Sequence, residues 1–127
     1  MLVAVLSREE EQIVESFIFL DIARKVLEKD LSRLQHAPLK IKEPYIRLIE
    51  AALEKLSTHM YRTKWEMKQA DLQVQLQRMD STFSEYSIFF RGYVVTAKYL
   101  NPHLRNQVSR TIEQLFTDTP AKPKQLY

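Results

Sequence analysis

Apolar residues between positions 72 and 100 recur in alternating steps of four and three. The series comprises Leu72, Leu76, Met79, Phe83, Tyr86, Phe90, Tyr93, Ala97 and Leu100. A mean step of 3.5 residues keeps one stripe of a helix facing a partner, as in helical bundles and coiled coils. No proline interrupts the series. The pattern therefore predicts helical structure with a coiled-coil-like seam over this stretch.

The N-terminal third of the chain carries a second helical pattern. Ser7 and Glu10 have the spacing of a capping box, in which each residue satisfies a free backbone N–H of the other. Apolar residues at helical spacing then continue to Leu34, and Pro38 ends the pattern. We expect a helix over 7–36. The helix is apolar nearly all round at 17–20, which favours burial among several helices or contact with another subunit.

A linker from Pro38 to Pro44 separates this helix from the next one. Proline suits the first turn of a helix, because the N–H that it lacks is not needed there. The apolar spacing that follows predicts a helix over 44–79. At 1.5 Å per residue the two predicted helices are each about 40–50 Å long, and we expect them to pair antiparallel.

The segment Asp80–Thr82 leaves two alternatives open. Its residues favour a helix N-terminus, which predicts a reversal and a separate helix over 82–99. The apolar series nevertheless keeps its phase through the segment, as it would in one continuous helix. The β-branched run Val94–Thr96 is compatible with a strand, but no second strand or turn signal supports that interpretation. Asn101 and Pro102 then open a helix predicted over 102–117. The predicted fold class is all-α, an up-down bundle of about four helices.

Composition favours the same fold class. The chain has 127 residues, 45% apolar and 28% charged, which is typical of a globular domain. Gly92 is the single glycine, and tight hairpins usually need glycine for positive φ angles. We expect one domain over 1–117 and a flexible tail over 118–127. The longest segment without a charged residue is 1–7, too short for a membrane helix, and no signal peptide is recognisable, so we expect a cytoplasmic protein.

The sequence contains no pattern typical of catalysis or metal binding. There is no cysteine and no glycine-rich phosphate loop. His36, His59 and His103 lack the glutamate three positions earlier that helical di-metal sites use. We predict that the protein is not an enzyme and binds no metal or cofactor.

The surplus of apolar helical surface favours a protein–protein interaction or assembly module, forming a homodimer or higher oligomer. The candidate interface residues are six large apolar side chains of this surface: Phe17, Phe19, Ile22, Trp65, Phe89 and Tyr99.

The alternative function is a small regulatory protein associated with nucleic acid. The net charge is +3, and this surplus lies entirely in residues 64–127. A strip of cations in this half could contact phosphates, and its candidate members are Arg91, Lys98, Arg105 and Arg110.

Overall fold

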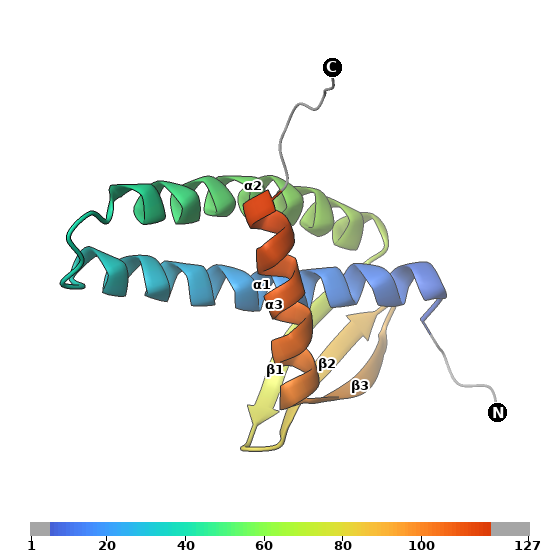
Figure 1. Ribbon diagram of the computed structural model, residues 1–127. Helices are drawn as coiled ribbons and strands as arrows, with labels where there is room; N and C mark the ends of the chain where they lie inside the picture. Colours follow the sequence, from blue (N-terminus) through green and yellow to red (C-terminus); the bar gives the residue numbers. More distant parts are fainter. Residues whose placement is uncertain (1–5, 118–127) are drawn as a thin grey trace.

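The computed structural model describes residues 6–117 and has an α+β fold (Figure 1). Three helices and a three-stranded antiparallel sheet follow one another along the chain. Their bounds are α1 (Arg8–Gln35), α2 (Glu43–Gln69), β1 (Leu72–Met79), β2 (Phe83–Phe90), β3 (Tyr93–Leu100) and α3 (Asn101–Thr117). The predicted tail, 118–127, lies outside the described residues.

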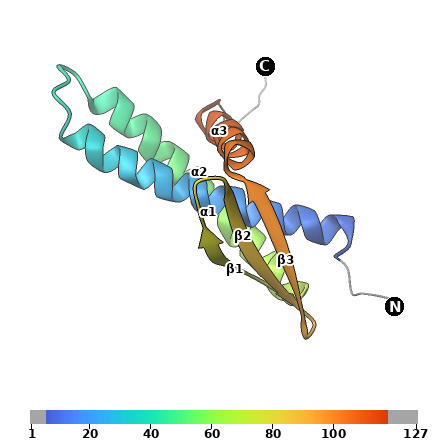
Figure 2. The ribbon, with the colours of Figure 1, turned by 90° about the horizontal axis from the view of Figure 1, so that it is seen from below.

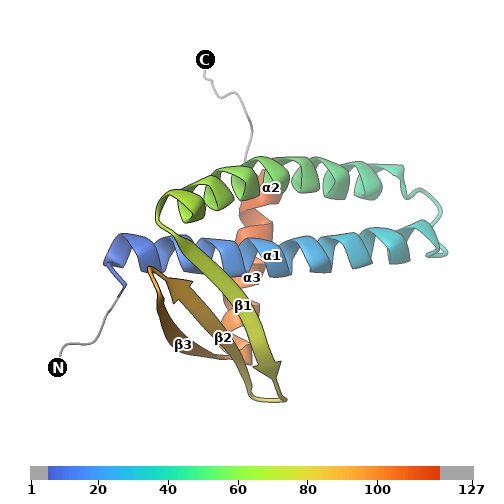
Figure 3. The same cartoon turned by 180° about the vertical axis from the view of Figure 1, so that it is seen from behind.

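The long helix α1 lies between α2 on one side and the sheet on the other (Figures 1 and 3). α1 and α2 run antiparallel, as predicted, and α3 crosses them both at a steep angle. Seen from below, α3 lies almost end-on, while α1 crosses the sheet diagonally (Figure 2). The sheet therefore covers only the N-terminal part of α1, and the C-terminal part extends beyond it.

The start of α1 confirms the predicted capping box. The Ser7 hydroxyl accepts a hydrogen bond from the Glu10 backbone N–H at 3.1 Å, and the Glu10 carboxylate accepts one from the Ser7 N–H at 2.9 Å. α2 has Pro44 in its first turn, also as predicted. It ends at Gln69, however, ten residues before the predicted boundary at 79.

The prediction of an all-α bundle with a coiled-coil-like seam is wrong. Residues 72–100 form a three-stranded meander in the order β1-β2-β3, with both neighbouring pairs antiparallel. The chain does reverse at Asp80–Thr82, but it reverses between two strands. Neither a helix over 82–99 nor a continuous helix through the segment is present.

The apolar series fits a strand because a step of four preserves the face of a helix and of a strand alike. Leu72 and Leu76 share the inner face of β1, and Tyr86 and Phe90 share that of β2. The steps of three fall at irregularities or change the face: one spans a bulge between Leu76 and Arg78, and another spans the β2–β3 turn. The period-two signal was present throughout, since apolar residues alternate with glutamine from 72 to 77.

One glycine suffices for this sheet because other residues make the remaining reversals. Gly92, with φ of 84°, and Arg91, with φ of 49°, form the two-residue β2–β3 turn. Asp71 takes φ of 57° between α2 and β1. At the β1–β2 turn, the Asp80 carboxylate accepts hydrogen bonds from the N–H groups of Thr82 and Phe83, at 2.8 and 2.7 Å.

The interior contains two apolar clusters, and all three helices contribute to both. The first cluster lies between the helices and includes Leu20, Leu27, Leu56, Val108 and Leu115. The second lies between the sheet and the helices and includes Val14, Ile18, Ile88, Phe90 and Leu104.

Asn101 joins the sheet to α3. Its backbone N–H donates to the Thr82 carbonyl at 2.8 Å, and its side-chain amide donates to the Asp80 carbonyl at 2.8 Å. Its side-chain oxygen accepts a hydrogen bond of 2.6 Å from the hydroxyl of Ser84, a residue only 2% exposed. These bonds fix the start of α3 beside the β1–β2 turn.

Candidate interaction groove

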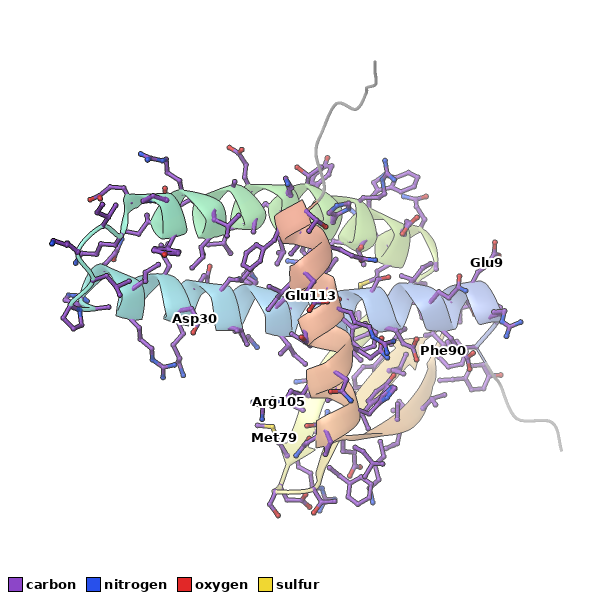
Figure 4. The ribbon with its side chains drawn as sticks, in the orientation of Figure 1. Glu9, Asp30, Met79, Phe90, Arg105 and Glu113 are labelled. Carbon is purple, nitrogen blue, oxygen red and sulfur yellow. The ribbon has the colours of Figure 1, made fainter. Side chains whose placement is uncertain are left out.

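An open apolar groove lies where α1 extends beyond the sheet. Its volume is about 1020 Å³, and its walls are α1, the inner face of β1 and α3. The apolar side chains that line it are Phe17, Ile22, Val26, Val74, Leu76, Met79, Leu104, Val108 and Ile112. Val26, Leu76 and Met79 are 37, 45 and 66% exposed. Figure 4 shows Met79 and Arg105 at the same end of this groove, beside the start of α3.

The free edge of β1 borders the groove. β1 pairs with β2 on one side, and no other strand of the described residues pairs with its opposite side. In Figure 1 this edge faces the space below the C-terminal half of α1. A shallower depression, lined by Lys64, Lys68 and the residues Leu72–Gln75, continues along the N-terminal half of the same strand. Open depressions therefore border β1 along 72–76 and at Met79.

The rim of the groove carries charges of both signs. Asp21 and Lys25 lie on α1, and Arg105 and Glu113 lie on α3. The Asp21 carboxylate forms ion pairs with Arg24 at 2.7 Å and Lys25 at 3.0 Å. Desolvation raises the pKa of Asp21, but the hydrogen bonds from Lys25 and Arg24 outweigh this effect and hold the pKa below its usual value. Asp21 is thus an anion at neutral pH beside an apolar surface.

The six candidate interface residues do not form one surface. Phe17 and Ile22 line the groove, half-buried. Phe19 is half-buried beside α3, Phe89 lies on the outer face of the sheet, and Trp65 is 57% exposed on α2. The remaining residue, Tyr99, packs edge-on against the Tyr86 ring at 5.9 Å between centroids. Two of the six therefore lie at the groove.

The four candidate cations for nucleic acid are also dispersed. Arg91 at the β2–β3 turn pairs with Glu10 at 2.6 Å, and this hydrogen bond lowers the pKa of Glu10. Lys98 lies on the outer face of the sheet, 5.2 Å from the centre of the Phe83 ring. Arg105 lines the groove, and Arg110 is exposed elsewhere on α3. The structure does not gather these cations into one strip, and nucleic-acid binding stays a prediction.

The apolar spacing does not identify the β1 residues of the groove as functional candidates. It predicts a helical position for Val74 and seam positions for Leu76 and Met79. The signal that could have identified them was the alternation of apolar residues with uncharged glutamines, which is typical of a strand with one buried face.

The described residues hold no group of three or more His, Cys, Asp or Glu side chains that could bind a metal ion. None of the helices within 6–117 is long and apolar enough to cross a membrane. The absence of enzymatic activity, metals and cofactors stays a prediction.

Comparison with known proteins places the chain in a family. A family model described as YhjD protein matches residues 5–120. Among curated proteins, the Uncharacterized protein YhjD of Bacillus subtilis (strain 168) is 27% identical over 107 residues, which are 84% of this chain and 89% of that protein. No solved structure matches. Because the family model covers almost all of the sequence, including every helix and strand described above, the chain belongs to the YhjD protein family.

Proposed function

We propose that the protein is a non-catalytic assembly module that self-associates through the groove between α1, β1 and α3. The observation that carries this proposal is the exposure of Leu76 and Met79 beside an open apolar groove. Large apolar side chains grouped around a concave surface, with a charged rim, are typical of protein–protein interaction sites. The surface proposed for association is formed by two helices and a strand, and not by helices alone as the sequence predicts.

The charges on the rim support a second copy of this chain as the occupant. The groove is lined by two acidic residues, Asp21 and Glu113, and two basic residues, Lys25 and Arg105. A surface that carries equal numbers of both signs can meet a copy of itself with opposite charges adjacent. A strongly acidic or basic partner would find no matching excess of charge there.

The test is the solution mass of the full chain over a range of concentrations, measured by light scattering and sedimentation equilibrium. We expect a dimer or higher oligomer in the micromolar range. Met79→Lys should weaken association at least tenfold, because it places a charge in the groove. Ile41→Lys is the matched control, since Ile41 is 64% exposed, much like Met79 at 66%, but lies in the α1–α2 linker.

A monomeric mass up to millimolar concentration would refute self-association. Equal weakening by both lysine substitutions would also count against the groove, since the effect would then follow from added charge alone.

A further inference from the structure

We propose that the free edge of β1 pairs antiparallel with β1 of a second copy, so that two three-stranded sheets join into one. This inference rests on the proposed self-association and specifies its geometry. Three features of the strand carry it: the lack of edge protection over 72–76, the alternation of its side chains, and the exposure of Leu76.

The first feature is that residues 72–76 of β1 lack the usual protection of an edge strand. Natural edge strands are commonly blocked by lysine, other charges or proline. Residues 72–77 contain neither a charge nor a proline. The charged residue of β1, Arg78, lies near the C-terminal end of the strand and pairs with Glu85 of β2 at 3.3 Å. A bulge near Gln77, which is also a common form of edge protection, leaves 72–76 in regular register with β2. The unprotected part of the edge is therefore 72–76.

The second feature is the alternation, which determines how two copies can face each other. The inner face of β1 carries Leu72, Val74 and Leu76, and the outer face carries glutamines. If residues of the same face lie opposite each other, both helical layers lie on one side of the joined sheet and apolar side chains meet in the groove. A shift of one residue would place glutamines against the apolar groove. The same-face registers are therefore favoured.

The third feature selects one register among them. Leu76 is 45% exposed and needs an apolar side chain opposite it. Leu72 is already buried, with 4% exposure, whereas Val74 is only half-buried at the edge. Val74 opposite Leu76 of the second copy satisfies this requirement for both residues, whereas Leu76 opposite itself would set Val74 against Arg78, beyond the bulge. The favoured register places Gln75 opposite Gln75 on the two-fold axis.

A single cysteine at position 75 tests this register, because the natural sequence contains no cysteine. Directly opposite residues of antiparallel strands have Cα atoms about 4.5–5.5 Å apart, within the range that a disulfide spans. Under mild oxidation we expect Gln75→Cys to form a covalent dimer in most of the protein, and reduction should reverse it. Thr96→Cys is the matched control, since Thr96 lies in the same cross-strand row through Ser87 but on the opposite edge strand. It should remain largely uncrosslinked.

A charge substitution at the same two positions gives an independent measurement. Gln75→Lys places two like charges opposite each other across the axis and should raise the dimer dissociation constant at least tenfold. Thr96→Lys should leave it within about twofold. Both side chains are exposed on the outer face of the sheet, so neither substitution disturbs the interior.

The outcomes separate this inference from the proposed function. A dimer that Gln75→Lys does not weaken, or that Gln75→Cys does not crosslink, overturns the β1 pairing while self-association stands. Equal crosslinking at positions 75 and 96 also overturns it, because it would indicate random collision. A monomer at all concentrations overturns the inference and the proposed function together.

Discussion

Asn101→Ala should destabilise the fold far more than its partly exposed position suggests, because it leaves the buried hydroxyl of Ser84 without a hydrogen-bond acceptor. The substitution removes the 2.8 Å bond to the Asp80 carbonyl and the 2.6 Å bond that Ser84 donates. An ordinary hydrogen bond contributes about 1 kcal/mol, and an unpaired buried polar group costs about 1–3 kcal/mol. Ser84 is 2% exposed, so water cannot replace the lost acceptor. We expect a loss of about 2–4 kcal/mol in the free energy of unfolding.

A double-mutant cycle isolates the free-energy cost of the unpaired Ser84 hydroxyl. Ser84→Ala alone should cost about 1 kcal/mol, since the half-buried Asn101 oxygen can still reach water. In the Ser84→Ala background, Asn101→Ala should then cost only about 1 kcal/mol, because position 84 no longer carries a hydroxyl that could lose its acceptor. The expected coupling between the two substitutions is therefore about 1–3 kcal/mol.

The assay is urea denaturation of the four proteins at one fixed protein concentration, so that self-association contributes equally to each. Asn106→Ala, an exposed asparagine on the same helix, is the control for the change of residue type and should stay within about 0.5 kcal/mol of the natural sequence. If the effects of Asn101→Ala and Ser84→Ala add to within about 0.3 kcal/mol, the reasoning from the buried hydroxyl is refuted.

Three further measurements test the sheet. Phe90→Ala should cost about 3–5 kcal/mol in urea denaturation because Phe90 is 2% exposed, while Phe89→Ala on the opposite face should cost clearly less; similar losses would contradict the strand geometry. Gly92→Ala should cost about 1–2 kcal/mol from its φ of 84°, and an unchanged midpoint would argue against the two-residue turn. Burial raises the pKa of Tyr99 to about 12, above the usual value near 10. Since the unfolded chain loses this proton first, stability should fall between about pH 10 and 12, and Tyr99→Phe should reduce the slope; an identical slope would contradict this origin.

The helical parts of the fold followed from local signals in the sequence. The capping box at Ser7, the linker before Pro44 and the spacing of apolar residues all act within a few residues of each other, so they can be recognised without tertiary information. The end of α2 was missed because Asp71, rather than glycine or proline, makes the reversal into β1 with φ of 57°. Aspartate tolerates this conformation, but no signal in the sequence predicts a positive φ angle at this residue.

The sheet was missed because two periodicities coexist in the same residues. A helix and a strand both accept a step of four, and the bulge and the β2–β3 turn absorb two of the steps of three. The residues that distinguish a strand from a helix here are apolar residues outside the seam, such as Val74, Ile88 and Val95. They continue the period of two that is typical of a strand. The groove was missed with the sheet, since its β1 wall exists only in the strand conformation.

α3 also has a consequence for the order in which the molecule can fold. α1 with α2, and the three strands with each other, are neighbours in sequence and close through short connections. α3 supplies Val108 and Leu115 to one cluster and Leu104 to the other. Lys55 of α2 also donates a 3.0 Å hydrogen bond to the Leu115 carbonyl of α3. Because α3 follows every other described element along the chain, both apolar clusters stay open during synthesis until it has emerged. The docking of α3 is then the step that closes both apolar clusters.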